Sequence, residues 1–270
     1  EPALLWKLAS IPSAFRPALE ERLARPTERR GLAGVPDESG VADALPLVWA
    51  CSDFVADACL RDRELLPWLF AERRLSEPHE LADFECDLES AVVPSSTDDA
   101  AFMDALRRFR RRHLVRIAWR DLAGLADVDT VLRELSLLAD VCIRAACRYA
   151  GAALTARHGA PRGSDGAPLD LLVLAMGKLG GGELNFSSDI DLVFLFPEHG
   201  ETGGARPLEH EEYFARLGRR VAQLLGSVTA EGFVYRVDLR LRPFGDSGPA
   251  IVSFDAFEDY LQQHGRDWER

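Results

Sequence analysis

Apolar residues recur at steps of three and four through the first part of the chain. In residues 131–149 they would line one face of a helix, formed by Val131, Leu135, Leu138, Cys142, Ala145 and Tyr149. Similar spacing occurs in residues 47–58, 65–70 and 102–117. Prolines separate these runs, at positions 12, 17, 26, 36, 46, 67, 78 and 94. Because a proline inside a helix costs about 3 kcal/mol, each should mark a boundary or a first turn. The pattern predicts an all-helical bundle over residues 1–160, with tryptophans 49, 68 and 119 in its core.

The pattern changes at HGAPRGSDGAP, residues 158–168, where glycine and proline predict a surface loop. Short apolar runs at 169–175 and 189–196 then predict buried strands, and helices are expected at 209–226 and from Ser253. The predicted class is α+β: a largely helical N-terminal part, then a small domain over residues 161–270 with a mixed sheet and flanking helices.

A third strand is predicted over residues 232–242, because apolar and charged positions alternate with period two. One face would carry Phe233, Tyr235, Val237, Leu239 and Leu241. The other face would carry Arg236, Asp238, Arg240 and Arg242. An edge strand with one solvated side would give the same pattern, so the strand alone does not indicate a site.

Candidate chemistry gathers in MGKLGGGELNFSSDIDLVFLF, residues 176–196. Asp189 and Asp191 are two positions apart and so share a face of the strand, about 6.6 Å apart along it. Two like charges held on one sheet repel, and a divalent cation removes that conflict. If the third strand pairs beside them, Asp238 becomes a third carboxylate, and three carboxylates can hold two metals for an in-line phosphoryl displacement.

The glycine-rich turn suits phosphate in that setting. Gly177 and Lys178 should end the first strand and open a short helix, whose free amide groups attract anions. Residues 180–182 are glycines, which let a phosphate approach the backbone without a Cβ in the way. Lys178 could neutralise a polyphosphate, although a solvated loop lysine explains it equally well.

Composition and net charge limit which kinds of partner the chain is expected to bind. The chain has 270 residues, 47% of them hydrophobic, and a net charge of −12, which opposes non-specific binding to nucleic acid and to anionic membranes. We find no signal-peptide layout and no apolar run of about 18 residues, so a cytoplasmic protein is expected. The start without methionine and the end inside a charged segment suggest a fragment of a longer protein. Five cysteines without CxxC spacing should be reduced, buried thiols.

Two further features are the arginine run, which has two competing interpretations, and the histidines. The stretch RRFRRR, residues 107–112, is either a solvated helix face paired with nearby acids or a docking patch for an acidic partner. The six histidines show no HxxxH or HExxH pairing, so we do not expect them to bind a metal.

The order of a glycine turn, a short helix, SDIDL and a later aspartate resembles the nucleotidyltransferase superfamily that includes DNA polymerase beta. Those enzymes usually have Gly-Ser where this chain has Gly177-Lys178. Longer motifs, GKLGGGELNFSSDIDLVFLFPEHG, GFVYRVDLRLRPFGDSGP and FEDYLQQHGRDWER, with LRRFRRRHLVRIAWRDLAG upstream, resemble the glutamine synthetase adenylyltransferases from about residue 45. That family is bifunctional. Its adenylylating half should read like ELGYGSDLDL and VDTRLRPSG, whereas this chain has ELNFSSDIDL and VDLRLRPFG, so it resembles the N-terminal, deadenylylating half.

This resemblance implies that inorganic phosphate removes AMP from a tyrosine of glutamine synthetase, giving ADP and the active synthetase. Asp189, Asp191 and Asp238 would be the catalytic, metal-binding residues, with Mg²⁺ or alternatively Mn²⁺ as cofactor. Phosphate or the nucleotide would be bound by Gly177, Lys178, Gly181, Gly182, Ser188, Arg236, Arg240 and Arg242. Adenylylated glutamine synthetase, phosphate and ADP are the expected partners, with a PII signalling protein also implied, and neither nucleic acid nor a membrane is expected.

Two alternatives stay open. An ATP-dependent adenylyltransferase would use the same fold and metals in the reverse direction, although the FSSDID and RPFGDSGP motifs disfavour it. A non-catalytic regulatory module would keep the helical part as an adaptor, but it would have no need for three converging carboxylates.

Overall fold

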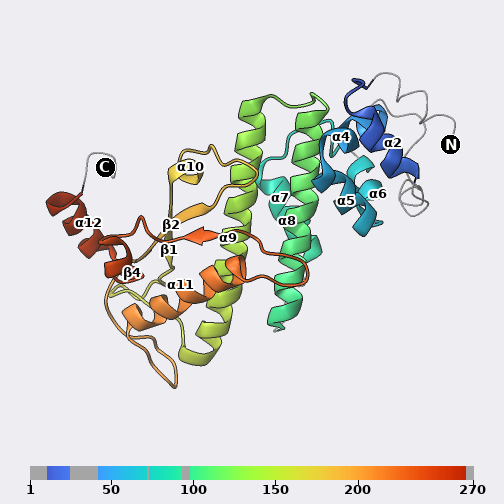
Figure 1. The fold of residues 1–270 in the computed structure, drawn as a ribbon. Coiled ribbons are helices and arrows are strands. Elements are labelled where there is room, and N and C mark those ends of the chain that lie inside the picture. Colours follow the sequence, from blue (N-terminus) through green and yellow to red (C-terminus); the bar gives the residue numbers. More distant parts are fainter. Residues whose placement is uncertain (1–10, 25–41, 72, 93–97, 266–270) are drawn as a thin grey trace.

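The computed structural model describes residues 11–24, 42–71, 73–92 and 98–265. Helices form the first part of the chain and a small sheet follows (Figure 1), which confirms the predicted α+β class. The first helices, blue in Figure 1, are α2 (Arg16–Ala24), η2 (Ala42–Ala44), α4 (Leu45–Cys51), α5 (Asp53–Arg61) and α6 (Leu65–Phe70). The next three are α7 (Leu81–Ala91), α8 (Asp99–Leu122) and α9 (Val128–His158).

Local signals set several helix ends. The Ser52 hydroxyl accepts a hydrogen bond from the Val55 amide at 3.3 Å, so the run predicted over 47–58 forms two helices, α4 and α5. Pro46 and Pro67 lie in the first turns of α4 and α6, where a missing N–H costs little. The prolines at 26, 36 and 94 lie outside the described residues.

Two apolar cores organise the helices. One is formed by α2, α4, α5 and α6 against the C-terminal half of α8, and it buries Trp49 and Trp119 as predicted. The other extends from α7, α8 and α9 into the sheet and the helix that follows it. This second core therefore includes residues on both sides of position 160, and the domain boundary there stays a prediction.

The sheet contains strands β1 (Leu172–Met176), β2 (Ile190–Phe196), β3 (Val237–Asp238) and β4 (Ile251–Ser253). Strand β1 is antiparallel to β2, while β3 and β4 are both parallel to β2, at its beginning and its end respectively. The helices of this part are α10 (Gly177–Gly180), α11 (His210–Gly226) and α12 (Phe254–Gln263). One face of β2 packs into the core with α9 and α11 (Figure 1). The predicted mixed sheet, its first two strands and the helix at 209–226 are confirmed. The predicted burial holds for β2 but is wrong for β1, where Leu172 and Leu174 are exposed because β1 lies at the edge of the sheet.

The long third strand is wrong, because β3 contains only Val237 and Asp238. The Asp238 carboxylate accepts a hydrogen bond from the Arg240 amide at 2.8 Å, and Arg242 donates its amide to the Leu239 carbonyl at 3.3 Å. An aspartate bonded to the backbone two residues ahead closes a turn, so the alternation beyond it does not continue as a strand.

The predicted pairing of the arginine run with nearby acids is confirmed for Arg108, Arg111 and Arg112, which pair with Glu231 or Asp62. The docking-patch interpretation stays a prediction. The first member, Arg107, is almost fully buried rather than solvated. The Arg107 guanidinium donates to the carbonyls of Met103 and Leu224 at 2.8 and 3.3 Å, and to those of Gly232 (2.7 Å) and Ser227. Arg111 donates to the Glu231 carboxylate at 2.8 Å. The run on α8 therefore fastens the segment between α11 and β3.

A buried carboxylate links α8 to α9. Glu134 is fully buried and receives hydrogen bonds from Arg116, at 2.7 Å, and from Arg120, so one negative charge faces two positive ones. Its Oε1 atom also accepts the His79 amide at 2.6 Å. Both arginines donate further to backbone carbonyls around residues 74–77, which spreads the excess positive charge over peptide dipoles.

The expectation of buried, reduced thiols holds for some of the five cysteines. Burial raises the pKa of Cys59 and Cys142 to about 12, so both stay protonated. Cys51 and Cys86 are free but exposed, so for them burial was wrong. Among the described helices, none is long and apolar enough to cross a bilayer.

We predict that Glu134→Gln lowers the free energy of unfolding by about 3–5 kcal/mol, because two buried guanidinium groups lose their counter-charge. Urea unfolding followed by tryptophan fluorescence measures this. Glu212→Gln is the matched control, since Glu212 pairs with Arg216 on an exposed face and its loss should cost less than about 1 kcal/mol. Equal losses in the two variants would contradict this account of the buried network.

Candidate active site

Strand pairing brings the three predicted aspartates together. Asp191 lies directly opposite Asp238 in the parallel pairing of β2 with β3, and Asp189 immediately precedes β2. Burial raises the pKa of Asp191, and the neighbouring charges of Asp238 and Asp189 raise it further. The three carboxylates therefore lie close enough to act on one another electrostatically, and their role as a shared site stays a prediction.

Two of the predicted arginines bind these carboxylates. Arg236 donates through Nε to Asp189 and through Nη2 to the Ser187 carbonyl at 3.1 Å. The Nε atom of Arg240 lies 2.9 and 3.0 Å from the two oxygens of Asp238, and these bonds hold the pKa of that carboxyl below its usual value. The cations therefore offset much of the repulsion within the cluster.

The third arginine has a different position. Arg242 donates from Nη1 to the Leu239 carbonyl at 2.7 Å, inside the turn that follows β3. Its charge still contributes to the lowered pKa of Asp238. The structure thus places Arg242 beside the cluster but bonded to the backbone.

Gly177 lies where the turn comes closest to the carboxylates. It follows Met176, the partner of Asp191 in the β1–β2 pairing, and has a φ of 56°. A Cβ built on Gly177 would lie 2.7 Å from Asp191 Oδ2, which is closer than real contacts allow. Only glycine fits this position, both for its left-handed backbone and for the space that the carboxylate occupies.

The other predicted phosphate ligands lie along the same turn. The Gly181 and Gly182 amides donate to the carbonyls of Gly177 and Leu179, each at 3.0 Å. Their hydrogens therefore point into the turn, and contact with phosphate at these two glycines stays a prediction.

Lys178 and Ser188 are close to each other. Lys178 Nζ donates to Ser188 Oγ at 3.4 Å, and that hydroxyl donates to Asn185 Oδ1 at 2.5 Å. Asn185 was not predicted as a site residue. The one sequence feature that could have pointed to Asn185 is its place in ELNFSSDIDL, because the adenylylating motif ELGYGSDLDL has glycine at that position.

The cluster offers carboxylate oxygens as donor atoms. Three carboxylates gather at one end of β2, and burial together with the charges of Asp238 and Asp189 raises the pKa of Asp191. Oxygen ligands of this kind are those that Mg²⁺ and Mn²⁺ prefer. The space beside Gly177 is also kept free of a side chain, directly at Asp191.

Comparison with known proteins agrees with these motifs. The family model of glutamate-ammonia ligase adenylyltransferase matches residues 42–270, which is most of the chain. The chain belongs to this family. The resemblance seen in the sequence is thereby confirmed at the level of the glutamate-ammonia ligase adenylyltransferase family.

Curated relatives carry the name bifunctional glutamine synthetase adenylyltransferase/adenylyl-removing enzyme. The relative from Thioalkalivibrio sulfidiphilus is 49% identical over 228 residues, covering 84% of this chain and 23% of the relative. The relative from Nitrosococcus oceani is 46% identical over 265 residues, covering 96% of this chain and 27% of the relative. The chain thus spans about a quarter of the length of these members of the glutamate-ammonia ligase adenylyltransferase family.

We predict opposite effects on stability from neutralising the two paired aspartates without metal at pH 7. The folded pKa of Asp191 is raised, so its ionisation costs stability as pH rises, and Asp191→Asn should stabilise the fold. The folded pKa of Asp238 is lowered, so its ionisation adds stability that is lost as pH falls, and Asp238→Asn should destabilise the fold. Each change should be below about 1 kcal/mol.

Urea unfolding at pH 7 and at pH 3 measures both effects. Both should shrink at pH 3, because the carboxyls of the unfolded chain become protonated there. If both variants changed stability in the same direction at pH 7, the electrostatic account of the pair would be contradicted.

We also predict that Gly177→Ala weakens Mg²⁺ binding by displacing the Asp191 carboxylate. Gly124→Ala is the matched control: its φ is 67°, but a Cβ there would meet nothing within 4 Å. Both substitutions carry a similar backbone cost of about 1 kcal/mol, so only the first should change the Mg²⁺ affinity measured by calorimetry. An unchanged Mg²⁺ affinity in Gly177→Ala would show that the close contact between Gly177 and the Asp191 carboxylate does not position Asp191.

Proposed function

We propose that this chain carries the adenylyl-removing activity, a phosphorolysis of adenylyl-tyrosine on glutamine synthetase. The observation that carries the proposal is the pairing of Asp191 with Asp238, with Asp189 immediately before β2. Membership of the family and the name shared by the relatives support glutamine synthetase as the protein substrate. The motifs ELNFSSDIDL and VDLRLRPFG favour the deadenylylating direction over the adenylylating one.

In the proposed reaction, an oxygen of inorganic phosphate attacks the phosphorus of the AMP group esterified to tyrosine. A new P–O bond forms to the phosphate, the P–O bond to the tyrosine oxygen breaks, and the phenolate leaves with a proton from solvent or phosphate. The products are ADP and unmodified glutamine synthetase. Little acid–base help is needed for such a transfer, so positioning and charge stabilisation supply most of the catalysis.

Asp189, Asp191 and Asp238 would hold Mg²⁺, with Mn²⁺ as an alternative. When bound, the cation stabilises the negative charge that develops on the attacking and leaving oxygens. Arg240 and Arg236 already donate to Asp238 and Asp189. A bound cation would therefore share these carboxylate oxygens with the two guanidinium groups.

Positive side chains around the carboxylates are suited to the anionic reactants. Arg236 and Arg240 can move from the aspartates to phosphate oxygens, which a planar guanidinium binds with two donors. Lys178, exposed on α10, adds a further positive charge and is bonded to Ser188, which directly precedes Asp189. Gly177 keeps the backbone close to Asp191, and with Gly181 and Gly182 it leaves room for the nucleotide phosphates.

We predict that the chain, mixed with adenylylated glutamine synthetase, Mg²⁺ and phosphate, releases ADP at a rate that depends on phosphate. Asp191→Asn should reduce this rate at least about a hundredfold, since loss of a metal ligand removes several kcal/mol of charge stabilisation. Liquid chromatography of the nucleotides measures ADP, and Arg73→Gln, in an exposed pair with Glu77, is the control that should leave the rate unchanged.

The outcomes separate the alternatives. Transfer of AMP from ATP to unmodified glutamine synthetase, without phosphorolysis, would reassign the chain to the adenylylating direction. Failure of both reactions with intact Mg²⁺ binding would contradict the proposed activity and favour a regulatory role.

A further inference from the structure

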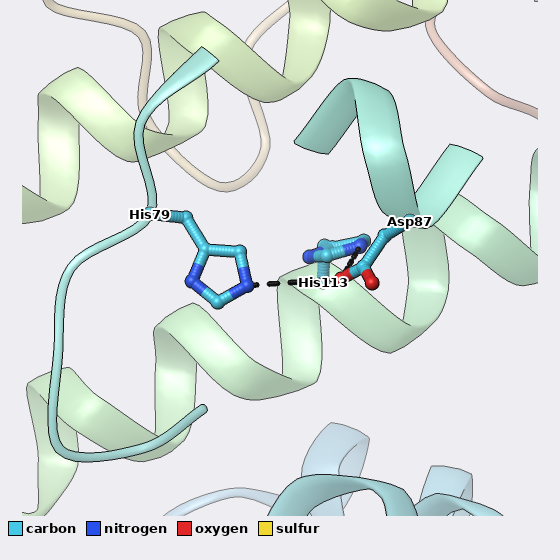
Figure 2. Close-up of side chains that lie close together, drawn as sticks. All are labelled: His79, Asp87 and His113. Atoms are coloured by element: carbon cyan, nitrogen blue, oxygen red, sulfur yellow. Dashed lines mark ion pairs between the residues drawn. The ribbon is translucent and has the colours of Figure 1, made fainter. Parts of the chain in front are cut away.

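Three side chains outside the aspartate site converge at the junction of α7 and α8. His79 lies in the segment before α7, Asp87 lies on α7 and His113 on α8, and Figure 2 shows their polar ends pointing toward one another. His113 is 1% exposed and His79 is 9% exposed. The proposed function uses none of the three. Their spacing of 8 and 26 residues along the chain gave no metal motif in the sequence.

The separations do not match hydrogen bonds. Asp87 Oδ2 lies 3.7 Å from His79 Nε2 and 3.5 Å from His113 Nε2, whereas N–H···O bonds span about 2.7–3.2 Å. Zinc binds histidine nitrogen and carboxylate oxygen at about 2.0–2.2 Å, so two ligand atoms of a tetrahedral site lie about 3.3–3.5 Å apart. One ligand atom from each of the three residues lies within 4.8 Å of the others. The cluster thus has nearly the dimensions of three corners of a zinc site.

Surrounding groups hold these side chains in place. Arg74 donates to Oδ2 and Oδ1 of Asp87, at 2.6 and 3.1 Å, and so orients the carboxylate. The His79 amide is bonded to the buried Glu134 at 2.6 Å. Contacts that orient the ligands are a regular part of metal sites.

Aromatic rings fix His113. Its ring centroid lies 4.6 Å from that of Phe109, 4.9 Å from that of Phe84 and 5.2 Å from that of Trp68. Its buried Nδ1 atom has no hydrogen-bond partner among the described residues. The ring therefore turns its Nε2 atom toward Asp87 and cannot rotate without disturbing three aromatic neighbours.

An opening leads to the cluster. A cavity of about 360 Å³ reaches Asp87 and His113 and is lined by Trp68, Arg74, Ser90, Arg108, Phe109 and Arg112, among others. Its arginines are partly neutralised, Arg112 by Asp62 at 2.9 Å and Arg108 by Glu231 at 3.5 Å. The cavity offers both an entry path and room for a fourth ligand.

We propose that His79, Asp87 and His113 bind a zinc ion, with a water molecule or a small anion from the cavity as fourth ligand. Two imidazole nitrogens and one carboxylate oxygen suit Zn²⁺ and disfavour Mg²⁺, which prefers oxygen ligands. The guanidinium of Arg74 shares Asp87 with the ion, so the affinity is lower than at a site with a free carboxylate. The positive surroundings favour an anion over a neutral fourth ligand.

Zinc at this position would connect α7, α8 and the segment before α7, where the two apolar cores meet. Ligand binding to the folded state alone stabilises it in proportion to the logarithm of the free ligand concentration. The site would therefore act on the stability of the helical part, separately from the aspartate cluster that binds Mg²⁺.

Cobalt(II) provides a direct test, because in a tetrahedral site it absorbs visible light. We expect one equivalent of Co²⁺ to give this band with the full chain in excess Mg²⁺, which occupies the aspartate cluster. Zn²⁺ should abolish the band and raise the unfolding temperature. His79→Gln and Asp87→Asn should each weaken Co²⁺ binding by more than about tenfold, the lower end of the effect of removing even an outer partner.

His199→Gln, at an exposed histidine, and Asp238→Asn, in the aspartate cluster, should leave the band unchanged. Circular dichroism shows whether each variant folds. If a variant does not fold, the Co²⁺ and Zn²⁺ titrations of the wild type still test whether the chain binds zinc. Absence of both the band and the zinc-dependent stabilisation in the wild type would overturn the proposal. So would a band that survives His79→Gln and Asp87→Asn but is lost in Asp238→Asn.

Discussion

The attachment of the segment before β3 to α8 is the constraint on which the candidate active site depends. Strand β3 pairs with β2 over only two residues, too few to fix Asp238 by backbone hydrogen bonds alone. Arg107 compensates by binding the carbonyls of Ser227 and Gly232, between α11 and β3, and that of Leu224 at the end of α11. The Arg110 guanidinium also lies 4.5 Å from the centroid of the Tyr235 ring. The helical part thus positions a residue of the sheet.

Charge is the second constraint, and the two parts of the chain satisfy it differently. At the aspartate cluster, the exposed arginines Arg236 and Arg240 pair with Asp189 and Asp238. In the helical part, Glu134 lies between two buried arginines whose remaining donors bind carbonyls. The exposed ion pairs can break when another ligand binds. The buried ion pairs of Glu134 instead fix α8 against α9, and Glu134 also accepts the His79 amide.

Periodicity predicted the elements that bury one continuous face. Helices α9 and α11 follow their apolar patterns closely, because burial of that face stabilises them. Helix α8 and strand β2 were also predicted, although both are buried on more than one side. The same reasoning failed at residues 239–242, where the Asp238 carboxylate closes a turn that an alternation of side chains cannot reveal. It also failed at Arg107, since a sequence shows a charge but not the carbonyls that surround it. The nearness of the aspartates was predictable because Asp191 lies on β2 and Asp189 immediately before it, whereas His79, Asp87 and His113 meet only through the packing of three separate elements.

The central claim is that Asp189, Asp191 and Asp238 bind one reacting centre with a divalent cation. Electron paramagnetic resonance of Mn²⁺ bound to the chain in the presence of ADP tests it most directly, through the coupling of the metal to phosphorus. We expect bound Mn²⁺ coupled to the ADP phosphates in the wild type, and loss of that coupled signal in both Asp191→Asn and Asp238→Asn. A coupled signal that persists in both variants would contradict the account.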